Sequence, residues 1–165
     1  MSLTIAGLDP RVHERKGFDC GVEPLNRYLQ ALAVQHSRKG ISTTFVLVDD
    51  VEPRIVLGYY TLSAASLLFE ALSDADRRRL PAYPVPAARI GRLAVALPAR
   101  GRRYGELLLQ NAIKRILSAR HILGVYAVVV EAKTEDAVAF YRRYGFRPCN
   151  FEDRKLYLPL GALVP

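Results

Sequence analysis

Apolar side chains recur three and four positions apart near the N-terminus, which predicts an amphipathic helix over about residues 24–35. Its apolar face comprises Leu25, Tyr28, Leu29, Leu32 and Ala33. Pro24 suits the first turn of this helix. Two runs rich in β-branched and aromatic residues follow at 44–48 and 55–63, and the turn residues at 49–53 between them predict a hairpin.

The next segment contains a helix-capping residue, a proline-rich stretch and a strand followed by a glycine-bearing turn. Ser73 predicts the start of a short helix that ends near Arg79. The proline-rich stretch 80–87 is interpreted as a long loop. A strand is expected at 89–96, followed by the turn ARGRRYG at 99–105.

The C-terminal half predicts two helices and two strands. The helix after the turn carries an apolar stripe of Gly105, Leu108, Leu109, Ala112, Ile113 and Ile116. A continuous apolar run at 125–131 indicates a buried strand. Thr134 predicts the cap of a second helix, which Gly145 ends, and a last strand is expected at 155–160. The order of elements predicts a mixed α/β sheet with helices on its faces, formed by one domain over 1–165.

Charge and composition bound the function without naming it. The formal net charge of +8 and the pI near 9.8 favour a polyanionic partner or, alternatively, a basic surface that is simply solvated. No apolar run approaches the roughly 20 residues of a membrane span, and no signal peptide is expected. Cys20 and Cys149 match no metal or redox spacing, and the three histidines are scattered, so no metal is expected.

The turn ARGRRYG has the chemistry of an anion site. A strand ends, a loop rich in glycine and arginine follows, and a helix begins, so unpaired backbone N–H groups meet the positive end of a helix dipole. The residues that would surround a pyrophosphate here are Arg100, Gly101, Arg102, Arg103, Tyr104 and Gly105. A loop of this composition is also compatible with an ordinary surface turn.

The segment AVAFYRRYGF at 137–146 follows about 40 residues later, and the pair resembles the GNAT family of acetyltransferases. That family binds the pyrophosphate of acetyl-CoA through a Q/R-x-x-G-x-G/A loop. Arg100 matches its first position and Gly105 its last, whereas Arg103 stands where the family has its middle glycine. The resemblance implies the GNAT fold, acetyl-CoA as co-substrate and N-acetyltransferase activity.

Further segments resemble a subgroup of the family. FDCGVEPLNRYL at 18–29, LGYYTLSA at 57–64 and RIGRLAV at 89–95 are similar to toxins of bacterial toxin–antitoxin pairs that acetylate aminoacyl-tRNA. This resemblance implies an aminoacyl-tRNA substrate, a small ribbon-helix-helix antitoxin as partner and a cytoplasmic location. It leaves a homodimer open and does not identify the aminoacyl group.

The resemblance also assigns roles to residues. Tyr141 would protonate the departing CoA thiolate, although its place in an apolar helix stripe also fits a core residue. Backbone N–H groups of Leu93, Ala94 and Val95 would hold the pantetheine and the thioester carbonyl. Candidate phosphate contacts for RNA are Arg77, Arg78, Arg142, Arg143 and Arg147. No general base is identified.

Two other functions remain open at this level. A GNAT enzyme that acetylates a small amine or a protein N-terminus would show the same cofactor motif. A catalytically inactive GNAT-fold module that binds nucleic acid or a partner is favoured by Arg103 in place of glycine.

Overall fold

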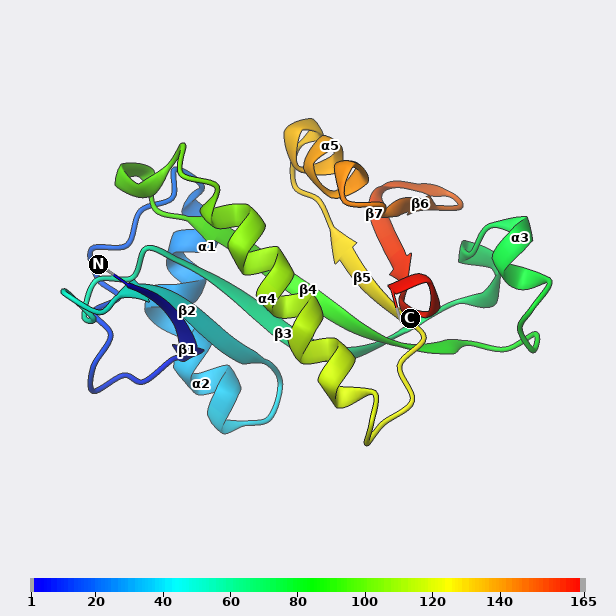
Figure 1. The fold of residues 1–165 in the computed structure, drawn as a ribbon, viewed down its shortest axis with the longest axis horizontal. Helices are drawn as coiled ribbons and strands as arrows, with labels where there is room; N and C mark the ends of the chain where they lie inside the picture. The colour runs from blue at the N-terminus through cyan, green and yellow to red at the C-terminus, as the bar shows by residue number, and fades with distance from the viewer. Residues whose placement is uncertain (1, 164–165) are drawn as a thin grey trace. The chain divides into compact units, whose positions relative to one another are not determined.

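The computed structural model describes residues 2–163 of the chain, and its helices and strands follow the predicted alternation (Figure 1). In chain order they are β1 (Leu3–Gly7), α1 (Glu23–Arg27), η1 (Tyr28–Leu32), α2 (Ala33–Arg38), β2 (Thr43–Asp49), β3 (Gly58–Leu67), η2 (Phe69–Ala71), α3 (Asp74–Arg77), β4 (Val85–Val95), η3 (Leu97–Ala99), α4 (Tyr104–Ala119), β5 (Ala127–Glu131), α5 (Glu135–Arg143), β6 (Arg147–Cys149), β7 (Glu152–Pro159) and η4 (Leu160–Leu163).

The strands have the hydrogen-bonded order β1-β2-β3-β4-β5-β7-β6, and β4 and β5 form a parallel pair among antiparallel neighbours. The mixed α/β class predicted from the sequence is therefore confirmed. The chain forms two compact units, unit 1 with residues 1–63 and 91–114, and unit 2 with residues 64–90 and 115–165.

Unit 1 has helices on both faces of its strands (Figure 1). On one face, Tyr28, Leu29 and Ala33 of the helical segment are buried in one core cluster with Tyr59 and Ala94 of the strands. On the other face, the first half of α4 packs closely. A Cβ atom at Gly58 would lie 2.8 Å from the Ala94 carbonyl oxygen and 2.9 Å from Leu108, so this approach requires glycine.

The first helical segment is longer than predicted and contains a π turn. It runs from Glu23 to Arg38, with the π turn at Tyr28–Leu32, and ends before Gly40, whose φ is +72°. The apolar face expected from the 3.6-residue period is buried at Tyr28, Leu29 and Ala33. Leu32 lies at the end of the π turn and is exposed.

Unit 2 is built on the parallel pair β4–β5, which runs from Ala87↔Ala127 to Ile90↔Val130, and on the antiparallel strands β7 and β6. Thr134 caps α5, because its hydroxyl accepts a hydrogen bond from the Ala137 N–H at 3.1 Å. Gly145, at φ +94°, follows the end of this helix as predicted.

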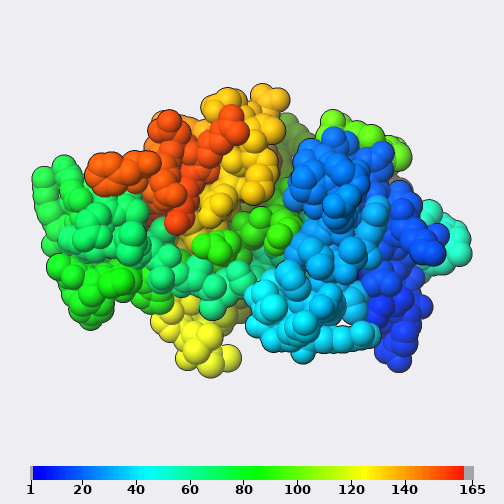
Figure 2. Space-filling view, turned by 180° about the vertical axis from the view of Figure 1, so that it is seen from behind, coloured from blue at the N-terminus to red at the C-terminus, as the bar shows by residue number. Residues whose placement is uncertain are grey.

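The α3 segment and the β6–β7 hairpin lie side by side in unit 2 (Figure 2, green and orange). Three hydrogen bonds join the hairpin turn to the segment before α3. The Asn150 N–H donates to the Ala71 carbonyl at 2.8 Å, and the Asn150 amide donates to the carbonyls of Leu72 at 2.8 Å and Glu70 at 3.2 Å. Ser73 caps α3 as predicted.

Some boundaries differ from those predicted. The stretch 80–87 is not entirely loop, because β4 already begins at Val85. The second strand of the hairpin begins at Gly58 rather than Ile55 and extends to Leu67. β1 and β6 were not predicted. Within the described residues, no helix has the length and apolar character that crossing a membrane requires.

Candidate functional site

The backbone of the loop between β4 and α4 has a conformation that is typical of anion-binding loops. After η3, the residues 100–103 lead into α4, and two of them have left-handed backbone angles, Gly101 with φ +80° and Arg103 with φ +61°. Alternation of left- and right-handed residues turns successive N–H groups toward one point and forms an anion-binding concavity. The left-handed angle at Arg103 also explains why a glycine suits this position.

The N–H groups of this loop are available to a ligand. Among residues 2–163, the N–H groups from Gly101 to Glu106 have no backbone acceptor, and the first helical bond runs from the Leu107 N–H to the Arg103 carbonyl at 3.2 Å. These donors lie at the positive end of the 16-residue helix α4. The arrangement suits a pyrophosphate.

The arginine side chains of the loop do different things. The Arg103 side chain is 88% exposed, and its guanidinium lies 3.9 Å from the Glu106 carboxylate, so it points outward and leaves the backbone accessible. Arg102 is exposed. Arg100 instead donates a hydrogen bond of 2.8 Å to the backbone carbonyl of Cys20. Tyr104 is buried.

Residues Leu93, Ala94 and Val95 lie in β4 after its pairing with β5 has ended. The last parallel pair is Ile90↔Val130, and β4 continues to Val95. Ala94 is buried, whereas Leu93 and Val95 are partly exposed. The strand edge beyond Ile90 is the segment for which the sequence predicts pantetheine contacts.

Tyr141 lies on α5 in unit 2 and is 7% exposed. Its ring packs against Phe140 and Phe146, with centroids 5.3 Å away in each case. Burial raises the pKa of Tyr141 above its ordinary value, so the hydroxyl carries its proton at neutral pH.

The Tyr141 hydroxyl has no hydrogen-bond partner within the described part of the chain. Only Thr44 Oγ1 and Arg89 Nε are both unpaired and fully enclosed among these residues, so the Tyr141 oxygen keeps some access to its surroundings. An unpaired hydroxyl on a buried ring is compatible with both roles considered for Tyr141, a proton donor and a core residue.

The candidate RNA contacts fall into two groups. Arg142 and Arg143, at the end of α5, and Arg78, after α3, are exposed. Arg77 forms an ion pair with Asp74, and Arg147 lies 3.0 Å from Asp76. Within residues 2–163 the side chains of the first group form no ion pair, whereas each arginine of the second group is paired with a carboxylate.

A polar cluster that the sequence did not reveal surrounds Asp76. Its carboxylate accepts hydrogen bonds from the Tyr157 hydroxyl at 2.5 Å, the Ser73 hydroxyl at 3.0 Å and Arg147 at 3.0 Å. Ser73 N–H donates to the Tyr157 hydroxyl at 2.8 Å. These hydrogen bonds connect α3 with β7. Only the capping pattern Ser73-x-x-Asp76 signals it in the sequence.

The cysteines and histidines form no site. Cys20 and Cys149 are buried free thiols, and burial raises the pKa of Cys149 to about 11. Within residues 2–163, no group of His, Cys, Asp or Glu side chains is arranged to hold a metal ion.

The mixed sheet, the N–H-rich loop before α4 and the tyrosine of α5 are features of an acyltransferase that uses a nucleotide-linked co-substrate. Residues 40–148 match the model of the acetyltransferase (GNAT) domain. The chain belongs to this family.

Two curated relatives extend the match beyond residues 40–148, one of them to almost the whole chain. A probable toxin TacT of Sinorhizobium fredii is 28% identical over 167 residues, which cover 96% of this chain and 92% of the relative. A tRNA-acetylating toxin of Mycobacterium tuberculosis is 34% identical over 129 residues, which cover 78% of this chain and 75% of the relative.

Solved structures of similar proteins agree in fold. AtaT complexed with acetyl-methionyl-tRNAfMet has a TM-score of 0.91 at 31% identity and covers 98% of this chain and 97% of its own. A tyrosine-to-phenylalanine mutant of KacT has a TM-score of 0.92 at 30% identity, with coverage of 99% and 98%. A tyrosine-to-phenylalanine mutant of AtaT bound to acetyl-CoA and the C-terminus of the antitoxin AtaR has a TM-score of 0.83 at 29% identity, with coverage of 98% and 95%.

Proposed function

We propose that the protein is a toxin that transfers the acetyl group of acetyl-CoA to the α-amine of an aminoacyl-tRNA and thereby blocks translation. One observation carries this proposal: 98% of the chain matches the AtaT structure complexed with acetyl-methionyl-tRNAfMet, at a TM-score of 0.91. The net charge of +8 favours the same polyanionic substrate.

Acetyl-CoA would be held by two parts of the chain. The N–H groups from Gly101 to Glu106 would bind its pyrophosphate, and the side chains of Arg102 and Arg103 would add positive charge around it. The backbone of Leu93, Ala94 and Val95 would hold the pantetheine and polarise the thioester carbonyl. When bound, acetyl-CoA supplies the activated acetyl group.

Transfer would be direct. The α-amine of the aminoacyl ester attacks the thioester carbon, the tetrahedral intermediate collapses, and the C–S bond breaks. The proton that the attacking amine loses would pass to water. Tyr141 would give its proton to the departing sulfur and regain one from water after the transfer, and its raised pKa keeps it protonated until the thiolate forms. Proximity of the two substrates contributes most to the rate in this scheme.

We further propose that residues 1–165 act as one GNAT domain, that the enzyme works in the cytoplasm where charged tRNA occurs, and that a small antitoxin neutralises it. The family match over 40–148 includes residues of both units and supports the first point. The AtaT structure with the C-terminus of AtaR supports the last.

Mass spectrometry of charged tRNA tests the proposal. After incubation with protein and acetyl-CoA, nuclease digestion should release aminoacyl-adenosine that is heavier by one acetyl group. If acetyl-CoA binds but every aminoacyl-adenosine keeps its mass while a small amine is acetylated, the tRNA substrate is wrong.

A further inference from the structure

The segment FDCGVEPLN at 18–26 is connected to the proposed pyrophosphate loop by hydrogen bonds within unit 1. The Leu97 N–H donates to the Asp19 carbonyl at 2.8 Å, and the Arg100 guanidinium donates to the Cys20 carbonyl at 2.8 Å. Leu97 is the first residue of the short η3 turn that leads into the loop, and Arg100 directly follows its last residue. Two adjacent carbonyls thus hold both ends of η3.

The two carbonyls are themselves fixed by side chains of the same segment. The Asp19 carboxylate accepts hydrogen bonds from the Gly21 N–H and from the Asn26 amide, both at 2.9 Å. The carbonyl oxygen of the Asn26 side chain accepts a bond from the Cys20 N–H at 2.8 Å. Asn26 is buried at the start of the first helical segment, so the turn is anchored to a rigid element.

Gly21 fits the turn for a specific reason. Its φ is +85°, and a Cβ atom there would lie 3.3 Å from Leu97 and 3.5 Å from the Arg100 guanidinium. A side chain at this position would therefore be strained by the backbone angle and would press against Leu97.

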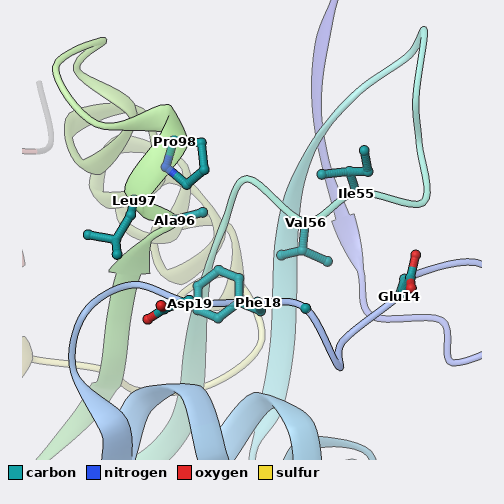
Figure 3. A pocket seen from close by; sticks show the side chains of 9 residues that line it. Glu14, Phe18, Asp19, Ile55, Val56, Ala96, Leu97 and Pro98 are labelled. Carbon is teal, nitrogen blue, oxygen red and sulfur yellow. The ribbon is translucent and has the colours of Figure 1, made fainter.

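The two segments also form part of the wall of one cavity. Phe18 and Asp19 on one segment and Ala96, Leu97 and Pro98 on the other line a cavity of about 410 Å³ (Figure 3). Phe18, Cys20 and Ala96 also belong to one core cluster, so packing and the hydrogen bonds together connect the two segments.

We infer that Asp19, Asn26 and Gly21 are positioning residues for acetyl-CoA: they hold Leu97 and Arg100 so that the N–H groups from Gly101 onward converge on the pyrophosphate. The inference rests on the proposed use of this loop for acetyl-CoA. In this account Arg100 acts on the cofactor through the loop backbone and not through a direct contact of its guanidinium. The Arg100 N–H is also occupied, since it donates to the Leu97 carbonyl at 3.2 Å.

The test compares Asp19→Ala with Asp9→Ala. Asp9 is a matched control. Its carboxylate also accepts a hydrogen bond from the backbone N–H of the residue two positions later, Arg11, at 2.9 Å, but it lies outside the segment that is bonded to the pyrophosphate loop. We expect Asp19→Ala to raise the Kd for acetyl-CoA roughly tenfold, as for the loss of a hydrogen bond to a charged group. Asp9→Ala should leave this Kd unchanged.

A second measurement separates positioning from general damage. S-acetylpantetheine lacks the pyrophosphate, so Asp19→Ala should leave kcat/KM for this donor unchanged while kcat/KM for acetyl-CoA falls. Equal losses with both donors, or an unchanged Kd for acetyl-CoA, would overturn the inference. If Asp19→Ala does not fold, Asp19→Asn keeps one oxygen that can accept both bonds but removes the negative charge that strengthens them, and it should show a smaller rise in Kd.

A double-mutant cycle tests the role of Arg100. If Arg100 acts through the same connection, Arg100→Leu and Asp19→Ala raise the Kd by less in combination than the product of their separate effects. Independent, multiplicative effects would mean that the guanidinium contacts the phosphates itself and that the inference is wrong. Wild-type protein that does not bind acetyl-CoA would refute the proposed function, whereas wild-type binding with unaffected variants would refute only the positioning role.

Discussion

The Arg147 guanidinium lies 3.0 Å from the Asp76 carboxylate, which the Tyr157 hydroxyl contacts from β7 at 2.5 Å. Arg147 thus belongs to a structural cluster of unit 2, although its position in the sequence suggested an RNA contact. Arg142 and Arg143, five and four residues earlier, are exposed. The proposed RNA contacts therefore separate into arginines that are already paired and arginines that are available.

This separation predicts different effects of substitution. Arg143→Ala should weaken binding of uncharged tRNA uniformly and reduce the slope of log K against log[salt] by about 1. Arg147→Ala should leave that slope nearly unchanged and lower the free energy of unfolding by about 1 kcal/mol, since its partly exposed ion pair is lost. Salt titrations of tRNA binding and urea unfolding of the two variants test these two expectations. An equal loss of salt slope in both would show that Arg147 also contacts phosphate.

Arg103 provides the second prediction. Its φ of +61° is costly for a residue with a Cβ atom, by roughly 1–2 kcal/mol, and glycine removes this cost but adds chain entropy to the unfolded state. Arg103→Gly should therefore change stability by between zero and about 1 kcal/mol in the stabilising direction. Acetyl-CoA should bind as tightly as before or more tightly, because the backbone donors remain.

Calorimetric titration with acetyl-CoA checks this expectation. Loss of binding in Arg103→Gly would mean that the Arg103 side chain folds over the phosphates as a ligand. Its present exposure of 88% would then describe only the unliganded loop.

His13 predicts how stability depends on pH. It is buried, its Nδ1 accepts the Asp9 N–H at 2.9 Å, and burial lowers its pKa below the ordinary 6.5. The unfolded chain then binds a proton more readily than the folded chain, so stability falls as the pH drops below about 6.5. His13→Asn, which retains an acceptor, should flatten the Tm between about pH 7 and pH 5. An unchanged pH dependence in this variant would assign the loss of stability to other groups.

Local signals in the sequence predicted much of the fold because they act over a few residues. Thr134 caps the start of α5 and Gly145 follows its end, as expected, since a capping hydroxyl and a left-handed glycine need no distant partner. β6 has only three residues and contains Pro148, so neither length nor pattern reveals it. β4 begins earlier than predicted although Pro86 has no N–H, because the Pro86 carbonyl still accepts the Tyr126 N–H at 2.8 Å.

The candidate site was predicted in part for the same reason. The glycines and arginines of residues 99–105 predict an anion-binding loop, because the hydrogen-bond donors of such a loop come from its own backbone. The connection between Asp19 and Leu97 joins residues 78 positions apart and depends on how two segments meet in unit 1. No pattern in either segment alone indicates that contact.

Tyr141→Phe tests the chemical step. The substitution removes one hydroxyl and keeps the ring that packs against Phe140 and Phe146, so the Tm and the affinity for acetyl-CoA should hold. Acetyl transfer should slow roughly 10²–10⁴-fold, the usual contribution of general acid catalysis. Because burial raises the pKa of Tyr141, the wild-type rate should not fall through loss of its proton at any pH up to about 10.

Tyr144→Phe is the matched control. Tyr144 lies three residues further along and also packs against Phe140, with ring centroids 5.1 Å apart, but it is only half-buried and is not the tyrosine that the family motif marks. Its substitution should leave the rate within a few-fold of wild type.

The most direct test of the whole account is single-turnover acetylation of aminoacyl-tRNA at saturating acetyl-CoA, followed by mass spectrometry of the released aminoacyl-adenosine. We predict rapid acetylation by the wild-type protein and by Tyr144→Phe, and a loss of roughly 10²–10⁴-fold in Tyr141→Phe at an unchanged Tm. Equal rates in all three proteins would show that Tyr141 is a core residue without a role in proton transfer. A wild-type protein that binds acetyl-CoA and leaves every aminoacyl-tRNA unmodified would contradict the central claim.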